Sequence, residues 1–433
     1  MSNRPGRARR RLTATEIDLE VVRQRALLVG TGAGTRTAAA AEASLDELAR
    51  LTDTAGAEPV QLVLQRRDRP DPATYVGPGK AEELRTSADA LDVDVVVFDD
   101  ELTPAQQRNL EQRLERDVVD RVALIMDIFA QHATSQAGML QVELAQLRYR
   151  LPRLRGRGIS LSQQGGGIGT RGPGETQLEV DRRRIQRRIT KLEKDLERVT
   201  QTRATQRKAR HRRAIPTVCL VGYTNAGKST LLNALTDAHV PVEDRLFSTL
   251  DPTTRRLRLP TGETVLCSDT VGFVQRLPHQ LVEAFRSTLE VVTDADLVVH
   301  VVDGASADAP VQVDAVRTVL DEIGAGDQPE LLVVNKLDAT APDADHLGAR
   351  EGAVAVSART GEGLEKLVDA ITDRLRSLGA VVELLVPYDR GDVLAALHRD
   401  GEVLVEVHAD VGTRVRARVD DVDLGRYQAF VTG

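Results

Sequence analysis

The chain has 433 residues, of which 28% are charged and 3% aromatic, and its net charge is -7. This length exceeds what one hydrophobic core normally holds, so two to four domains are expected, and the lack of tryptophan argues against base stacking as the main mode of recognition. No apolar run approaches the roughly 18 to 20 residues of a membrane span, and no secretory hydrophobic region is present at the N-terminus. These features predict a soluble, cytoplasmic protein, expected to be monomeric, in which Cys219 and Cys267 are reduced core residues.

The N-terminal part combines a basic tail with a segment of alternating strands and helices. Residues 1–19 contain several arginines without an apolar period, which predicts a disordered tail. Short apolar runs follow at 26–30, 60–64 and 93–98, separated by helical segments. This alternation predicts a small α/β domain with a parallel sheet at residues 20–128.

The next segment, residues 129–213, carries two apolar stripes with helical spacing on either side of a glycine-rich stretch at 156–175. The stripes are Leu140, Leu144, Leu147, Leu151 and Leu154, and then Ile185, Ile189, Leu192, Leu196 and Val199. Two such stripes predict an antiparallel helical hairpin with the glycine-rich stretch at its tip. Pro152 is expected to end or kink the first helix near Arg150 or Leu151.

This hairpin is strongly basic. Residues 148–213 hold 20 Lys and Arg against 6 Asp and Glu, a local balance of +14 in a chain that is negative overall. A solvated helical face is the usual role of such a run. Because the excess lies beside a glycine-rich tip that can follow an irregular surface, we favour contact with RNA phosphates.

Residues 218–230 read VCLVGYTNAGKST, in which Gly222, Gly227, Lys228 and Ser229 fit the pattern G-x-x-x-x-G-K-[ST] after an apolar strand. The glycines let backbone N–H groups surround an oligophosphate at a helix N-terminus. Lys228 is expected to reach the β- and γ-phosphates, and the Ser229 hydroxyl to ligate Mg²⁺. The predicted cradle consists of Gly222, Tyr223, Thr224, Asn225, Ala226, Gly227, Lys228, Ser229 and Thr230.

Two further motifs follow at predicted strand ends within residues 214–378. The first is Asp269, Thr270, Val271 and Gly272, after an antiparallel pair expected at 256–259 and 265–267. Asp269 is expected to support the Mg²⁺ shell and the Gly272 N–H to sense the γ-phosphate.

The second motif reads the base. It consists of Asn335, Lys336, Leu337 and Asp338, followed by Ser357, Ala358 and Arg359. The Asp338 carboxylate can accept two hydrogen bonds from the guanine edge, whereas adenine lacks both donors. Asn335 is expected to brace the loop, the Lys336 stem to cover the base, and the backbone at 357–358 to bind the guanine carbonyl. The chain should therefore bind GTP with Mg²⁺ in preference to ATP.

The loop between the cradle and Asp269 contains Phe247, Ser248 and Thr249. A threonine hydroxyl here should complete the Mg²⁺ shell, and Thr249 is favoured over Thr253 and Thr254. Phe273 occupies the position of the water-orienting glutamine of Ras-like proteins. Phenylalanine cannot orient water, so slow intrinsic hydrolysis stimulated by a partner is expected.

Residues 379–433 predict a small α+β module, with strands at 381–386, 403–407 and 414–419 and a helix at 392–398. His398 and His408 lack neighbours typical of metal ligands, which favours structural roles.

From about residue 25 to 375 the chain resembles the HflX family of ribosome-associated GTPases, in the Obg-HflX superfamily of the TRAFAC class. The resemblance rests on GYTNAGKST, DTVGF and NKLD and on stretches such as Asp120-Arg121, 141–147 and 172–175. It implies binding to the large ribosomal subunit, splitting of stalled ribosomes under stress, and a hairpin tip near the peptidyl-transferase region. It assigns phosphates and Mg²⁺ to Gly222–Thr230, the switch threonine to Thr249, and catalytic positions to Lys228, Thr249 and Gly272.

Some members of the family are reported to bind ATP through the N-terminal domain. In this sequence only the turn at 77–80 is compatible with such a site. We favour the interpretation that this turn is a glycine turn with an exposed lysine. Our main hypothesis is a GTP-hydrolysing switch that engages the large subunit, with the hairpin as effector arm. The alternative is a nucleotide-gated RNA-binding or ribosome-assembly factor without splitting activity. A tRNA-modifying GTPase is disfavoured because both cysteines are expected to be buried.

Overall fold

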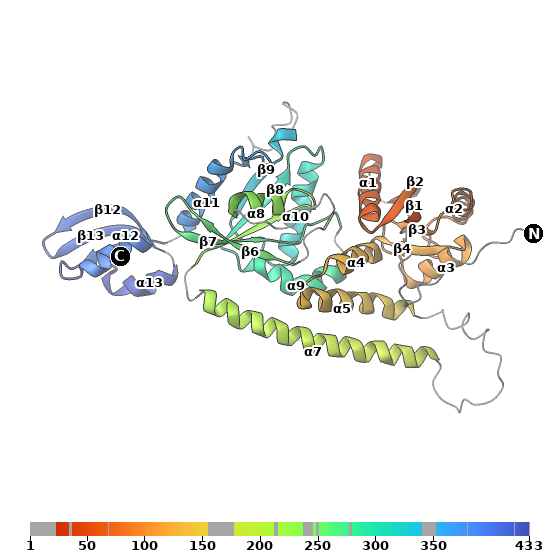
Figure 1. The fold of residues 1–433 in the computed structure, drawn as a ribbon, viewed down its shortest axis with the longest axis horizontal. Helices are drawn as coiled ribbons and strands as arrows, with labels where there is room; N and C mark the ends of the chain where they lie inside the picture. Colours follow the sequence, from red (N-terminus) through yellow and green to blue (C-terminus); the bar gives the residue numbers. More distant parts are fainter. Residues whose placement is uncertain are drawn as a thin grey trace, which may run out of the picture.

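The computed structural model describes residues 23–33, 37–67, 69–154, 177–211, 215–236, 246–247, 251–276, 279–339, 352–378, 380–419 and 421–432. Figure 1 shows an N-terminal α/β unit at one end, a central α/β unit, a small C-terminal unit at the other end, and two long helices lying along the first two units. Among the described residues, no helix is both long and apolar enough to cross a membrane.

The N-terminal unit is a four-stranded parallel sheet in the order β2-β1-β3-β4. Its strands are β1 (Gln24–Ala33), β2 (Ala57–Arg67), β3 (Val95–Phe98) and β4 (Asp117–Asp120). Its helices are α1 (Ala38–Thr54), α2 (Pro78–Ala90), α3 (Pro104–Leu114) and α4 (Arg121–His132). Helices cover both faces, because Leu28 and Val97 pack with α1 and α4 whereas Leu27 and Val96 pack with α2 and α3.

The strands of this sheet are longer than the apolar runs that predicted them. The predicted parallel sheet is confirmed, with β1 and β2 longer at both ends than expected. Strand β4 was not predicted, because only Val118 and Val119 of its four residues are apolar. The boundary predicted at residue 128 falls within α4, whose N-cap is the Asp120 side chain.

The two long helices are α5 (Gln136–Arg153) and α7 (Gln177–His211), which lie side by side (Figure 1). Their stripes pack together as predicted, around buried Leu144, Ile189 and Leu192. Arg188 and Glu143 form an ion pair at 2.6 Å across the same seam. The predicted glycine-rich tip, 156–175, lies outside the described residues.

Pro152 does not end α5 where predicted. The helix continues to Arg153, because a proline in the last turn removes only one backbone donor and this turn has other partners. The Arg153 guanidinium lies 3.5 Å from the centre of the Tyr149 ring and donates to the Leu102 carbonyl at 2.6 Å. The bond to Leu102 fastens the end of α5 to the N-terminal unit.

The central unit is a six-stranded sheet in the order β10-β9-β8-β5-β7-β6, parallel except for β6. The antiparallel pair predicted at a sheet edge is therefore confirmed. Its strands are β5 (Thr217–Gly222), β6 (Thr253–Arg258), β7 (Thr264–Asp269), β8 (Leu297–Asp303), β9 (Glu330–Asn335) and β10 (Val354–Ala355). Its helices are α8 (Lys228–Thr236), α9 (His279–Thr293), α10 (Ala309–Glu322), the short 3₁₀ helix η1 (Leu337–Ala339) and α11 (Leu364–Leu378).

The C-terminal unit is an antiparallel three-stranded sheet in the order β11-β13-β12, as the strand pattern suggested. Its elements are β11 (Ala380–Val386), α12 (Gly391–Asp400), β12 (Glu402–Ala409), β13 (Gly412–Val419), α13 (Asp421–Tyr427) and η2 (Gln428–Phe430). His398 Nε2 lies 2.9 Å from a Glu406 oxygen. Across the described chain, no three His, Cys, Asp or Glu side chains are grouped to hold a metal ion.

Candidate nucleotide-binding site

The segment between β5 and α8 folds as a tight loop at the carboxyl end of a central strand. Gly222 and Gly227 have φ angles of +150° and +92°. A Cβ atom would lie 2.2 Å from the Val301 carbonyl oxygen at Gly222, and 2.3 Å from Asn335 Nδ2 at Gly227. Glycine is therefore required at both positions, and the loop brings the backbone N–H groups at the start of α8 together.

Lys228 points back into this loop. Its Nζ donates to the carbonyl oxygens of Gly222 and Tyr223 at 3.2 and 3.0 Å, and the residue is buried. Burial lowers the pKa of Lys228 to about 8, and the nearby Asp269 carboxylate acts in the opposite direction. A buried ammonium group that donates to two carbonyl oxygens is well placed to bind a negatively charged ligand.

Ser229 and Asp269 face one another at the start of α8 and the end of β7. The Ser229 hydroxyl lies 2.5 Å from Asp269 Oδ2, and both residues are buried. A hydroxyl and a carboxylate from these two elements are the hard oxygen donors that Mg²⁺ prefers. The donor set therefore fits a magnesium ion, which would neutralise phosphate charge at this point.

Gly272 brings the segment after β7 against the phosphate loop. A Cβ there would lie 2.8 Å from Thr224 Cγ2 and 3.2 Å from Lys228 Nζ, so only glycine permits this approach. Phe273 is buried, and its backbone carbonyl accepts from Thr224 N at 2.7 Å. A buried apolar side chain at this position holds the two segments together and offers no group to orient water.

Asn335 connects the phosphate loop with the segment after β10. Its Nδ2 donates to the Ala226 carbonyl and its Oδ1 accepts from Ala358 N, both at 2.9 Å. Lys336 forms an ion pair with Asp303 at 2.7 Å. The polar ends of β8, β9 and β10 therefore lie at one edge of the sheet.

Asp338 lies beside this junction. Its carboxylate accepts from the Ser357 hydroxyl at 2.6 Å and pairs with Arg359 at 2.5 Å. The hydrogen bond from Ser357 and the charge of Arg359 lower the pKa of Asp338 below its ordinary value. Asp338 is thus an ionised acceptor, and a ligand that displaces the exposed Arg359 side chain meets an unprotonated carboxylate.

The structure brings together the predicted residues of the cradle, of 269–272, of 335–338 and of 357–359. Phe247 is buried apart from them, with its ring centre 4.7 Å from that of Phe129 on α4. Ser248 and Thr249, including the predicted threonine ligand, lie outside the described residues.

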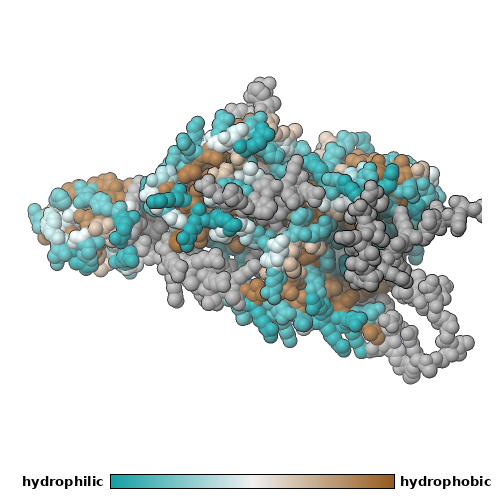
Figure 2. All heavy atoms as spheres, viewed as in Figure 1, coloured by the Kyte–Doolittle hydropathy of each residue, from teal (hydrophilic) through white to brown (hydrophobic). Residues whose placement is uncertain are grey.

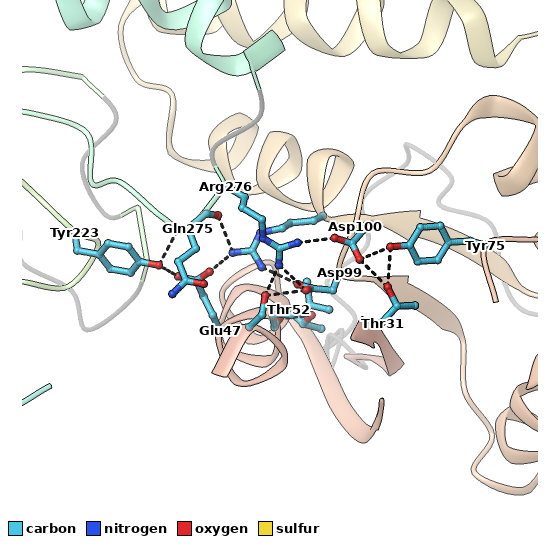
Figure 3. Close-up of polar contacts among 12 residues, drawn as sticks. Thr31, Glu47, Thr52, Tyr75, Asp99, Asp100, Tyr223, Gln275 and Arg276 are labelled. Atoms are coloured by element: carbon cyan, nitrogen blue, oxygen red, sulfur yellow. Dashed lines mark hydrogen bonds and ion pairs between the residues drawn. The ribbon is translucent and has the colours of Figure 1, made fainter. Parts of the chain in front are cut away.

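Sequence reasoning missed a polar network that joins this site to the N-terminal sheet (Figure 3). The Tyr223 hydroxyl donates to Glu47 on α1 and accepts from Gln275 N at 2.7 Å. Arg276 reaches Asp99 and Asp100 at 2.6 and 2.5 Å. The available signal was the set of charged residues that follows β3 and β4, since the carboxyl ends of parallel strands meet at one edge.

Arg121 is the buried centre of this network. It pairs with Glu47 and, at 2.8 Å, with Asp99, and it donates to the Gln275 carbonyl at 3.2 Å. Burial alone would lower the pKa of Arg121, but the two carboxylates hold it above its ordinary value. Buried charged residues around Arg121 therefore connect the candidate nucleotide site with the N-terminal sheet.

A glycine loop between a buried strand and a helix, a serine facing a carboxylate at the next strand end, and an Asn-Lys-x-Asp segment beyond it define a P-loop GTPase domain on a mostly parallel sheet. Family models match the chain as a GTP-binding GTPase N-terminal region at 42–130, a GTP-binding GTPase middle region at 132–210, and a 50S ribosome-binding GTPase at 217–336.

Curated relatives named GTPase HflX align over most of the chain. That of Escherichia coli K12 is 44% identical and covers 88% of this chain and 91% of its own, and that of Caldanaerobacter subterraneus is 48% identical and covers 87% and 88%. The chain therefore belongs to the HflX family and is a GTPase. A GTP-binding protein of Sulfolobus solfataricus, solved with GDP, is also similar, at 24% identity and a TM-score of 0.42, covering 82% of this chain and 99% of that one.

Proposed function

We propose that this GTPase is a switch that binds the large ribosomal subunit in its GTP form and dissociates stalled ribosomes, with the α5–α7 hairpin as its effector arm. The observation that carries the proposal is the combination in one chain of a guanine-type pocket and a long, cationic helix. The 50S ribosome-binding description of the matched family supports the choice of partner.

Within the pocket, each proposed role follows from position. Lys228 and the N–H groups of residues 222–230 bind the phosphates, and Ser229 binds Mg²⁺ together with Thr249. Gly272 contacts the γ-phosphate through its N–H. Asp338 accepts from the guanine edge, with Asn335 and the backbone near Ala358 shaping the pocket.

The outer face of α7 supports contact with RNA. Hydrophilic side chains gather along the described part of this helix at the lower edge of Figure 2. The exposed cations on it include Arg182, Arg184, Arg187, Lys191 and Lys194. Phosphate binding by such a row releases counterions, so it should dominate affinity and depend on salt.

The test is sedimentation of the purified protein with large ribosomal subunits, in the presence of GDP or of a non-hydrolysable GTP analogue. We expect the protein to sediment with the subunits only with the analogue. Equal sedimentation with both nucleotides would refute the claim that GTP controls binding to the subunit. Splitting is tested separately, by incubating stalled 70S particles with the protein and GTP and following the appearance of free subunits.

A ribosome-assembly or RNA-binding factor remains the second candidate, favoured by the buried Phe273 in place of a water-orienting side chain. Multiple-turnover hydrolysis with and without ribosomes separates the two. Strong stimulation supports the switch, and an unchanged rate with persistent RNA binding supports the second candidate.

A further inference from the structure

Asp251, just before β6 of the GTPase domain, holds the start of the first hairpin helix. Its Oδ2 accepts from the backbone N–H groups of Thr134 and Ser135 at 3.0 and 2.6 Å, and from the Thr134 hydroxyl at 2.8 Å. Its Oδ1 accepts from the Ser135 hydroxyl. A single carboxylate from a distant part of the chain therefore binds the N-terminus of α5 with both oxygens.

The sequence at the start of α5 accommodates this carboxylate. Ser135 is the N-cap, and its hydroxyl accepts from Gly138 N at 2.9 Å while it donates to Asp251. A Cβ at residue 138 would lie 2.8 Å from Asp251 Oδ1, so glycine leaves the room that the carboxylate occupies. The helix dipole further favours a negative charge at this end.

A second attachment lies on the other side of Thr249. Phe247, two positions before it, packs edge-to-face on Phe129 of α4, and Phe129 in turn packs on Phe285 of α9, with ring centres 4.7 and 4.8 Å apart. Asp251 stands two positions after Thr249. The chain is thus attached to α4 and to α5 immediately on either side of the proposed switch threonine.

We propose that Asp251 is a positioning residue that transmits the nucleotide state of the GTPase domain to the base of the hairpin. This inference rests on the proposed function, because it assumes that the loop carrying Thr249 responds to the γ-phosphate, as such loops do in other GTPases. A change at Ser135 reaches α7 through the apolar seam of the hairpin, and over a helix about 50 Å long a small rotation becomes a large displacement.

The test measures the hairpin directly and needs no ribosomes. Spin labels are attached to Gln186→Cys on the exposed face of α7 and Asp314→Cys on the exposed face of α10, while native Cys219 and Cys267 are buried and protected. Pulsed distance measurements are made on the full chain with GDP and with a non-hydrolysable GTP analogue plus Mg²⁺. We expect the label-to-label distance to shift between the two nucleotides.

In Asp251→Asn this shift should be lost, while nucleotide affinity stays within about twofold of the parent. Asp327→Asn, which changes an exposed carboxylate between α10 and β9, is the matched control and should keep the full shift. Ser135→Ala should reduce the distance shift. Ser135→Thr, which keeps the hydroxyl, should show the same shift as the parent. A full shift in Asp251→Asn, or no shift in the parent, would overturn the inference.

The two proposals fail in different experiments. If the distance shift depends on Asp251 but ribosome binding is equal with GDP and the analogue, the coupling stands and the ribosomal switch fails. If ribosome binding depends on the nucleotide and Asp251→Asn keeps the full shift, the switch stands and the coupling through Asp251 fails.

Discussion

Arg276, which follows the segment 269–272 of the GTPase domain, lies 2.6 Å from Asp99 at the end of β3 in the N-terminal sheet. The same carboxylate pairs with Arg121 at 2.8 Å and is only 2% exposed. Ligands of open parallel sheets bind beyond the carboxyl ends of the strands. In this protein that position on the N-terminal sheet is filled by two guanidinium groups, one of which comes from the GTPase domain.

The first prediction concerns this cluster. Asp99→Asn leaves Arg121 buried with Glu47 as its remaining carboxylate, so it should lower the free energy of unfolding by about 3 kcal/mol. Arg276→Ala should cost less, about 1 kcal/mol or below, because that side chain is 34% exposed. Denaturant unfolding followed by circular dichroism measures both. Asp89→Asn, in an exposed ion pair with Arg116, is the control, and an equal loss there and at Asp99 would contradict the account.

The second prediction concerns pH. The pKa of Lys228 is about 8 in the free protein, and bound phosphates should raise it again, so nucleotide binding should take up a proton wherever the free lysine is neutral. GDP affinity should therefore fall as pH rises above 8, by up to about tenfold per pH unit. Calorimetry in buffers of different ionisation enthalpy should show uptake of about one proton at pH 9 and about a tenth at pH 7. Equal affinity at pH 7 and pH 9 would refute the burial argument.

A third prediction addresses the base. Asp338→Asn replaces an acceptor with a donor, so GTP affinity should fall by about 10- to 100-fold while xanthosine triphosphate affinity rises. Competition of the two nucleotides against a fluorescent GDP analogue measures the change. Asp373→Asn, at an exposed position on α11, should leave both affinities unaltered. If Asp338→Asn leaves the preference for GTP over xanthosine triphosphate unchanged, Asp338 does not contact the base.

A fourth prediction concerns the exposed face of α7. Replacing Arg182, Arg184 and Arg187 together by alanine should reduce the slope of log affinity for large subunits against log salt by about 2 to 3. The matched control replaces the exposed arginines of edge strand β6, Arg255, Arg256 and Arg258, and should keep the slope. If both triple variants lose the same slope, the contact is a general effect of net charge and is not made by α7.

Much of the GTPase site was predictable because its chemistry is local in the chain. The phosphate loop joins strand, glycines, lysine and helix within thirteen residues, and each later motif follows directly on an apolar strand. The hairpin stripes were predictable for a similar reason, since helical spacing alone defines the seam around Leu144 and Ile189.

Other features needed long-range contacts to appear. Strand β4 has only two apolar residues and so shows no pattern. Helix α5 continues past Pro152, where Arg153 binds the Leu102 carbonyl of the N-terminal unit. The residues around Arg276 and Asp251 form no sequence pattern from which their binding partners could be predicted. Their ion pairs and hydrogen bonds join residues more than 100 positions apart.

The sequence by itself determined that this protein binds a guanine nucleotide on a parallel sheet and carries a basic helical arm, because periodicity and motif spacing are properties of neighbouring residues. Only the tertiary structure decided that Asp251 binds the N-terminus of α5, the first hairpin helix. It also decided that Arg276 pairs with Asp99 at the carboxyl edge of the N-terminal sheet. Such contacts depend on how separately folded units meet in space, and no local pattern of residues records that meeting.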